Sequence, residues 1–161
     1  MPVGTGLLNP VSDAYDRRPF KERVYLTLFS PPVDISHPER LPALVLAYIG
    51  DAVYELAIRQ YLVGRGLTRV NQLHKEAVKY VRADNQARVM HALQDRLSPA
   101  EEAVARRGRN AHGSHPPRGG DVLSYRYSTG LESLVGYLYL SGQWQRLEEI
   151  INLARQVVEE T

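Results

Sequence analysis

The sequence predicts an all-α protein with one folded domain, and two observations support this fold class. Apolar residues recur at intervals of three and four in successive segments from residue 42 onward, as they do along one face of a helix. Helix start and stop signals separate these segments, such as the capping box SPAE at residues 98–101 and the pair Ser141-Gly142. A chain of 161 residues is long enough to bury a core between such helices.

The first strong helix is predicted to begin near Pro42 and to end before Gly64. Its residues are apolar on most sides, which predicts a central, buried helix. Gly50 lies inside it, where glycine costs roughly 1 kcal/mol relative to alanine. We therefore expect this helix to pack closely against another helix at Gly50.

Further segments carry the same helical periodicity: residues 71–81, 84–96, 98–107, 128–140 and 143–160. Asn71 and Ser128 are predicted to cap two of these helices. Residues 108–127 are rich in glycine, proline and polar side chains, which predicts a long loop.

Residues 1–40 are predicted to form a proline-rich, partly ordered arm, followed by the folded domain at residues 41–161. The chain contains no cysteine, which excludes disulfides and thiolate chemistry. Its start lacks the apolar stretch of a signal peptide. Its most apolar run, LPALVLAYIG, is shorter than the roughly 20 residues that cross a bilayer. We expect a soluble, cytoplasmic protein without a membrane segment.

Basic residues are concentrated in the middle of the chain. Residues 59–109 contain eleven Arg and Lys against five Asp and Glu, whereas residues 132–161 contain two against five. A basic face favours phosphate-bearing partners, although a solvated helix face explains such a run more simply. Glycines in the predicted loop let a ligand approach the backbone, and arginine forks suit phosphates. The candidate phosphate contacts are Arg106, Arg107, Arg109 and Arg118, followed by His112 and His115.

Two acids stand within otherwise apolar helices, Asp51 in LVLAYIGDAVYELAI and Glu132 in STGLESLVGYLYL. Burying a charge is costly unless it is paired or bound to metal. Two such acids near each other would offer oxygen ligands to a hard cation such as Mg²⁺, which activates water at a phosphodiester. On the residues alone, structural ion pairs with Arg59 or Arg126 are the favoured explanation. Glu55, one turn beyond Asp51, fits a salt bridge with Arg59 better than a site role.

Other catalytic motifs are lacking from the sequence. The five histidines do not have the spacing of a zinc site. The chain contains neither a glycine-rich phosphate loop nor a nucleophile elbow. The acid pair is therefore the strongest candidate for chemistry.

Several longer motifs resemble one known family. ALVLAYIGDAVYEL is similar to the signature helix of ribonuclease III, and YRYSTGLESLVGYLYL resembles that family's second acidic helix. NQLHKEAVKYVRADNQA and ARRGRNA are further matches, and the whole pattern most resembles the compact bacterial form, Mini-ribonuclease III. The resemblance covers residues 41–160 and implies a ribonuclease III-like helical endonuclease domain.

This resemblance implies a metal-dependent endoribonuclease that cleaves double-stranded RNA, with Mg²⁺ as its cofactor. By position, Asp51 and Glu132 correspond to the family's essential aspartate and glutamate, and we expect them to be catalytic residues and metal ligands. The resemblance further implies a homodimer and a precursor of large-subunit (23S) ribosomal RNA as substrate. Whether a ribosomal protein assists as a partner is left open by the sequence. The compact form lacks a separate double-stranded-RNA-binding domain, so we expect the basic loop to contact RNA.

The resemblance is incomplete at three positions. Full-length ribonuclease III carries further acids where this chain has Leu44, Ala47 and Thr129. The compact form resembles this reduced set, so we predict activity and leave the number of metals per site open. A non-catalytic module of the same fold that binds structured RNA is the alternative that the absent acids favour. A helical adaptor, in which Asp51 and Glu132 form buried ion pairs, is the second alternative.

Overall fold

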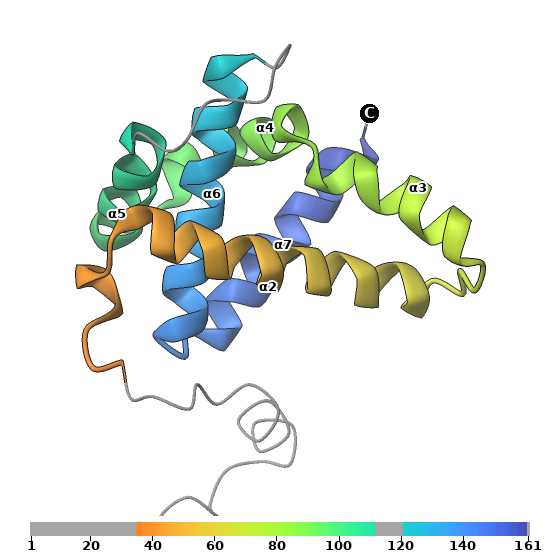
Figure 1. Ribbon diagram of the computed structural model, residues 1–161, viewed down its shortest axis with the longest axis horizontal. Coiled ribbons are helices and arrows are strands. Elements are labelled where there is room, and N and C mark those ends of the chain that lie inside the picture. Colours follow the sequence, from red (N-terminus) through yellow and green to blue (C-terminus); the bar gives the residue numbers. More distant parts are fainter. Residues whose placement is uncertain (1–34, 112–120, 161) are drawn as a thin grey trace, which may run out of the picture. The chain divides into compact units, whose positions relative to one another are not determined.

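The computed structural model describes residues 35–111 and 121–160, which form helices and connecting turns without a β-strand. The prediction of an all-α fold is therefore confirmed. No helix within these two ranges combines the length and the apolar character needed to cross a membrane. In chain order the helices are η2 (Pro38–Arg40), α2 (Ala43–Gly64), α3 (Val70–Val81), α4 (Ala83–Leu93), η3 (Gln94–Arg96), α5 (Pro99–Asn110), α6 (Val122–Leu140) and α7 (Trp144–Glu159) (Figure 1).

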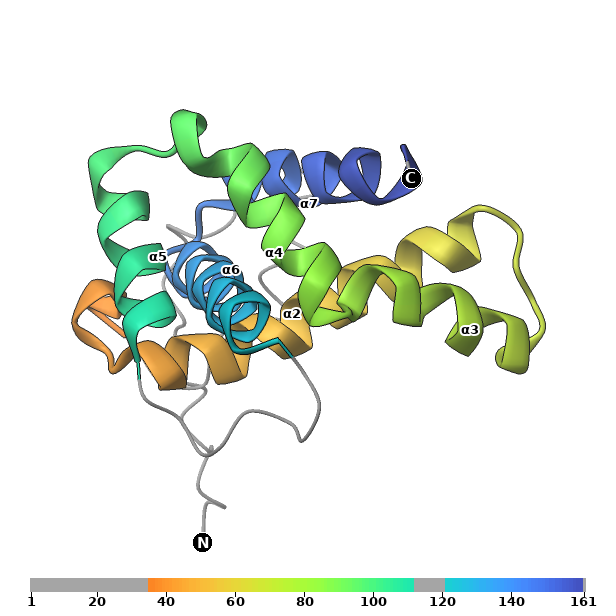
Figure 2. The same ribbon diagram turned by 90° about the horizontal axis from the view of Figure 1, so that it is seen from above.

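Helix α6 forms the centre of the arrangement. Its residues Leu131, Leu134, Val135 and Leu138 are completely buried. Figure 2 looks nearly along α6 and shows α2, α4, α5 and α7 around it. Because neighbouring helices cover α6 on most sides, polar side chains on this helix lie close to the interior, and Glu132 is one of them.

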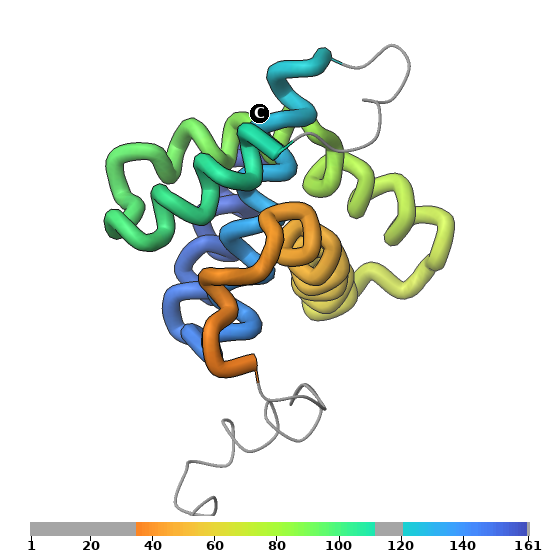
Figure 3. Tube along the Cα trace, turned by 60° about the vertical axis from the view of Figure 1, so that its left-hand side comes forward, coloured from red at the N-terminus to blue at the C-terminus, as the bar shows by residue number. Residues whose placement is uncertain are grey.

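Two glycines allow α2 and α6 to cross in close contact, as the view along α2 in Figure 3 illustrates. A Cβ atom added at Gly50 would overlap the backbone carbonyl of Glu132, and one added at Gly136 would overlap that of Leu46. Any larger residue at either position would push the two helices apart. The predicted close packing at Gly50 is confirmed, and it brings the segment around Asp51 against the segment around Glu132.

Helix α2 is buried along one face only. The buried face contains Leu46, Tyr54, Ile58 and Leu62, which are at most 1% exposed. The prediction that this helix is buried on most sides is wrong for the single chain, because apolar composition does not tell which residues face the core. The apolar side chains on the outer part of α2 are Leu44, Val45, Tyr48, Leu56 and Val63, exposed by 40–79%.

The start of α5 follows its sequence signal, whereas the start of α3 does not. Ser98 and Glu101 form the predicted capping box, each side chain accepting the other's backbone N–H. Asn71 is not a cap, because α3 already begins at Val70 and Asn71 lies in its first turn. The residue before α3 makes no side-chain capping hydrogen bond, so this helix lacks the polar cap that the sequence suggested.

The predicted loop of residues 108–127 is shortened at both ends by helix. Helix α5 continues to Asn110 and α6 begins at Val122. Asp121 caps α6, because its carboxylate accepts hydrogen bonds from two backbone N–H groups of the first turn. Ser128 is therefore an interior residue instead of a cap, and its hydroxyl donates to the carbonyl three residues earlier at 2.8 Å.

Residues just before the predicted domain start contact the domain. The guanidinium of Arg107 donates to the carbonyl oxygen of Glu39 at 2.6 Å and to that of Leu41 at 3.4 Å. These bonds hold η2 and the start of α2 against α5. The unit that contains the helices begins at Ile35, and the rest of the predicted arm, residues 1–34, lies outside the described residues.

Candidate active site

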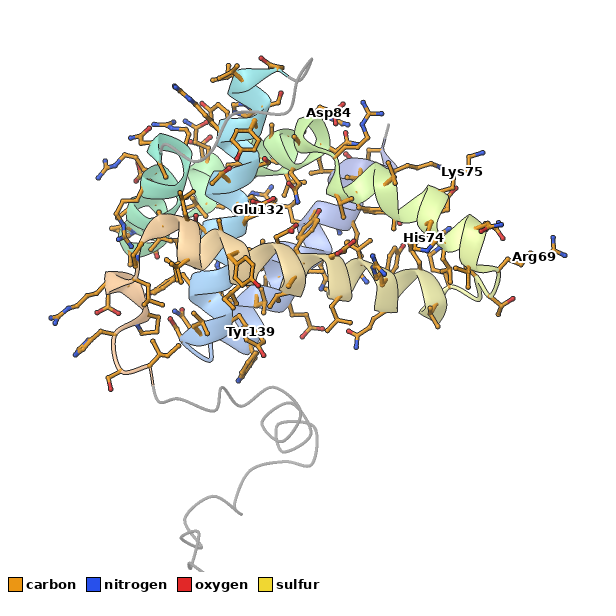
Figure 4. All side chains as sticks on the ribbon, viewed as in Figure 1. Arg69, His74, Lys75, Asp84, Glu132 and Tyr139 are labelled. Carbon is orange, nitrogen blue, oxygen red and sulfur yellow. The ribbon has the colours of Figure 1, made fainter. Side chains whose placement is uncertain are left out.

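Asp51 and Glu132 lie where α2 and α6 cross. Asp51 follows Gly50 directly on α2 and is exposed, whereas Glu132 on α6 is partly buried. The charge of Asp51 acts on the pKa of Glu132, as expected for carboxylates on adjoining turns of crossing helices. Figure 4 labels Glu132 where α6 passes behind α2. The structure thus brings together the two acids that the sequence singled out.

Both carboxyl groups stand in surroundings that disfavour their charge. Burial is the largest cause that raises the pKa of Glu132, to about 8, and the negative charge of Asp51 adds to it. The pKa of Asp51 is also raised, first by desolvation and then by the charge of Glu55. The crossing therefore disfavours two negative charges at once, unless a bound cation offsets them.

Among the described residues, neither carboxylate has the cationic partner that a structural ion pair requires. The salt bridges among the described residues include neither Asp51 nor Glu132. Arg59 instead donates to Glu55 at 2.6 Å, and Arg126 is exposed. The ion-pair explanation is therefore wrong for the part of the chain described, while the salt bridge predicted between Glu55 and Arg59 is confirmed.

Gln86 on α4 belongs to the site, although sequence analysis did not identify it. It is 2% exposed, and its amide opposes the rise in the pKa of Glu132, as a hydrogen-bond donor to the carboxylate does. Its neighbours on the buried face of α4 include Met90 and Leu93. A glutamine within an otherwise apolar helix face was the signal that would have pointed to it.

The positions of the family's further acids are filled by residues without charge. Ala47 is buried, and Leu44 is 40% exposed. Thr129 is buried and its hydroxyl donates to the carbonyl of Tyr125 at 3.0 Å. In the described ranges, no group of three or more His, Cys, Asp and Glu side chains could together hold a metal ion. Among the described residues, Asp51 and Glu132 are therefore the acids that the two helices bring together at the crossing.

Such a donor set fits a hard divalent cation that keeps most of its coordination to water and substrate. Mg²⁺ is usually held through one or two carboxylates, with waters and phosphate oxygens as its other ligands. Asp51 and Glu132 match this pattern because they repel each other and lack a cationic neighbour among the described residues. The chain has no cysteine, so the thiolates that favour softer metals are unavailable to it.

The predicted phosphate contacts have different surroundings. Arg106 is exposed, whereas the guanidinium of Arg109 lies over the ring of Tyr127, 5.5 Å from its centroid. The guanidinium of Arg107 is engaged with backbone carbonyls, including that of Glu39. Three of the predicted contacts lie outside the described residues: His112, His115 and Arg118.

A model of the family described as the ribonuclease III domain matches residues 44–143, a span that contains Asp51, Gln86 and Glu132. The chain belongs to the ribonuclease III family. It is accordingly an endoribonuclease.

Similar curated proteins place it more narrowly within that family. Mini-ribonuclease 3 of Symbiobacterium thermophilum is 48% identical over 125 residues, which cover 78% of this chain and 96% of that protein. Mini-ribonuclease 3 of a Thermoanaerobacter species is 51% identical over 120 residues, covering 74% of this chain and 84% of that protein. The predicted resemblance to Mini-ribonuclease III is confirmed.

A solved structure supports the same fold. The crystal structure of a protein from Fusobacterium nucleatum superposes with a TM-score of 0.66 at 28% sequence identity. The alignment covers 73% of this chain and 93% of that chain. Together with the family match, it confirms the predicted ribonuclease III-like helical domain.

Proposed function

We propose that this endoribonuclease cleaves double-stranded RNA with Mg²⁺ as cofactor, and that Asp51 and Glu132 are the carboxylates that hold the ion. One observation carries the proposal. The two acids adjoin at a helix crossing, both have raised pKa values, and neither has a cationic partner among the described residues. Such a pair weakens the fold by itself, so a purely structural role does not account for it.

A divalent cation bound at this pair would neutralise charge on the scissile phosphate and lower the pKa of the attacking water. Asp51 and Glu132 bind as carboxylates, because a nearby positive charge favours their ionised forms. The contact at Gly50 sets their separation through backbone packing. Attack of water on phosphorus breaks the bond to the 3′-oxygen, and the products carry a 5′-phosphate and a 3′-hydroxyl.

The basic segment at the end of α5 supplies the proposed contacts to the RNA backbone. Double-stranded RNA is recognised by shape, through phosphates and 2′-hydroxyls. Arg106 is the best placed of the described candidates because its side chain is exposed. Arg107 and Arg109 already have partners within the protein, so fewer of their N–H groups are available to RNA phosphates. The remaining candidates, His112, His115 and Arg118, lie outside the described residues and stay predictions from the sequence.

We propose that the outer face of α2 joins two copies into a homodimer. This face exposes a row of apolar side chains, of which Tyr48 is 79% exposed. Contiguous exposed apolar residues mark interaction surfaces. Asp51 lies three residues beyond Tyr48 and thus next to it on the helix. A two-fold dimer would therefore bring two acid pairs toward one RNA duplex, one for each strand.

The proposed cellular substrate is a precursor of 23S ribosomal RNA in the cytoplasm. Its support is the similarity to the Mini-ribonuclease 3 proteins. Phosphate contacts carry affinity without sequence choice. A ribosomal protein that presents the precursor is a fitting partner for an enzyme of this kind.

The proposal is tested by cleavage of a long double-stranded RNA by the purified protein. The reaction is run with Mg²⁺ and with a chelator, beside Asp51→Asn, Glu132→Gln and the control Glu102→Gln, which alters an exposed acid on α5. We expect cutting by the wild type and by Glu102→Gln in Mg²⁺ only. Each site variant should lose at least about a hundredfold in rate, in line with losing a group that stabilises the transition state.

Two other outcomes would overturn parts of the proposal. Cutting that survives in Asp51→Asn and Glu132→Gln would show that the acid pair is not the metal site. RNA binding without any cutting by the wild type would favour the non-catalytic RNA-binding module. The uncharged residues Leu44, Ala47 and Thr129, which stand where full-length ribonuclease III has acids, favour that alternative.

A further inference from the structure

Gln86 is a buried polar side chain on a helix face that otherwise builds the core. It is 2% exposed, and Ala87, Met90 and Leu93 are buried on the same helix. A buried amide without hydrogen bonds is costly, and methionine or leucine would fill this space without that cost. The presence of an amide here therefore requires a specific partner.

That partner is the carboxyl group of Glu132. Helix α4 packs against α6, and the buried side chain of Gln86 lowers the pKa of Glu132, as an amide that can donate a hydrogen bond to the carboxylate does. The backbone N–H of Gln86 is already used, because it donates to the carbonyl of Arg82 at 2.9 Å. An ionised carboxylate only accepts hydrogen bonds, so the side-chain NH₂ of Gln86 is the donor.

We propose that Gln86 is a positioning residue, which holds the Glu132 carboxylate in the orientation that binds the metal ion. This inference rests on the proposed function, because it takes Glu132 to be a metal ligand. Three helices then contribute to one site: α2 through Asp51, α6 through Glu132 and α4 through Gln86. A hydrogen bond to one oxygen of Glu132 leaves its other oxygen for the cation.

The chemistry of an amide suits this role better than that of a cationic side chain. An arginine or lysine at this place would offset the charge of Glu132 and would compete with the incoming cation. A neutral amide restricts the rotation of the carboxylate and leaves its charge intact. Partners that orient metal ligands in this way typically change metal affinity or activity on the order of ten- to a hundredfold.

The test is a metal titration of the RNA-free protein. Mn²⁺ binding is measured by electron paramagnetic resonance for the wild type, Gln86→Met and Met90→Leu. Gln86→Met removes the amide and keeps an unbranched side chain, and Met90→Leu alters the same helix face one turn away. We expect Gln86→Met to bind Mn²⁺ about ten- to a hundredfold more weakly, and Met90→Leu to bind within about twofold of the wild type.

Thermal unfolding in a chelator separates positioning from a merely structural role. A positioning role predicts that Gln86→Met unfolds at the temperature of the wild type or above it, while its metal affinity falls. A structural role predicts the reverse, a lower unfolding temperature with unchanged metal affinity. The second result would overturn the inference.

A measurement on the wild type keeps the inference testable even if Gln86→Met does not fold. The side-chain NH₂ resonances of Gln86 are followed in ¹⁵N-labelled protein as Mg²⁺ is added. We expect them to shift with the same midpoint as metal binding. Resonances that stay unchanged while the metal binds would overturn the role of Gln86.

The variant Glu132→Gln distinguishes failure of this inference from failure of the proposed function. If the wild type binds no divalent metal, or if Glu132→Gln binds it as tightly as the wild type, the proposed metal site is wrong, and the inference falls with it. If Glu132→Gln loses metal binding and Gln86→Met retains it fully, only the role of Gln86 is wrong.

Discussion

The substitution Glu132→Gln is expected to stabilise the metal-free protein at alkaline pH. Burial and the charge of Asp51 raise the pKa of Glu132 from its ordinary 4.5 to about 8. Between these two values the folded chain keeps a proton that the unfolded chain has released. The free energy of unfolding therefore falls as the pH rises through this window. Glutamine has no proton to release, so the variant should not show this fall.

The size of the effect follows from the same pKa values. The difference between 4.5 and about 8 sets an upper bound of about 5 kcal/mol at 1.36 kcal/mol per pKa unit. Glu132 is only partly buried, and water around it reduces the effect to about 2–3 kcal/mol. For a domain of this length, each kcal/mol shifts the midpoint of thermal unfolding by about 2–4 °C. We expect Glu132→Gln to unfold about 4–12 °C above the wild type.

The assay is calorimetric unfolding in a chelator at about pH 5 and about pH 8.5. These two values span most of the interval between the pKa of Glu132 in the unfolded chain and its pKa in the folded chain. The control Glu148→Gln removes an exposed acid on α7 and should change the midpoint little at either pH. The gain in Glu132→Gln should appear at the higher pH and largely disappear at the lower one. Added Mg²⁺ should raise the midpoints of the wild type and of Glu148→Gln but leave that of Glu132→Gln unchanged. A variant that is less stable than the wild type at the higher pH would refute the reasoning, because the charged carboxylate would then have a favourable partner.

Three further substitutions test the fold, the RNA surface and the dimer. Gly50→Ala should lower the free energy of unfolding by about 3 kcal/mol or more, since its Cβ would overlap the α6 backbone, and urea unfolding equal to the wild type would contradict that contact. Arg106→Ala should weaken RNA binding and lower the slope of log affinity against log salt concentration by about 1. Arg107→Ala should mainly lower the unfolding temperature, because Arg107 bonds to backbone carbonyls. Equal effects of the two variants on RNA binding across a salt series would contradict this difference. Tyr48→Asp should shift the protein from dimer to monomer in sedimentation velocity, and a dimer of unchanged stability would place the interface elsewhere.

The helices and the acid pair could be predicted from the sequence because strong local signals mark them. Apolar periodicity indicated every long helix of the described chain, and the capping box at Ser98 marked one start correctly. Gly50 indicated a close helix contact because glycine is unfavourable inside a helix without such a reason. Asp51 and Glu132 stood out because acids are rare within apolar helix faces.

The features that the sequence did not reveal depend on tertiary packing, that is, on which other part of the chain each residue contacts. Ser128 and Asp121 are both good capping residues, and only the position of the first turn decides between them. The outer face of α2 is as apolar as its buried face, so periodicity cannot separate core from surface. Gln86 and Arg107 act through partners far away in sequence, Glu132 and the carbonyl of Glu39, which no local pattern indicates.

Under the proposed function, the close crossing of α2 and α6 also determines when the enzyme can become active during synthesis. Its two acids come from segments separated by half of the chain, and neither helix alone contains both. A nascent chain that has released α2 from the ribosome therefore has no complete acid pair until α6 has emerged and docked against it. The same dependence means that an expanded state with intact helices but loosened packing should be inactive, so RNA cleavage would serve as a sensitive reporter of native tertiary structure.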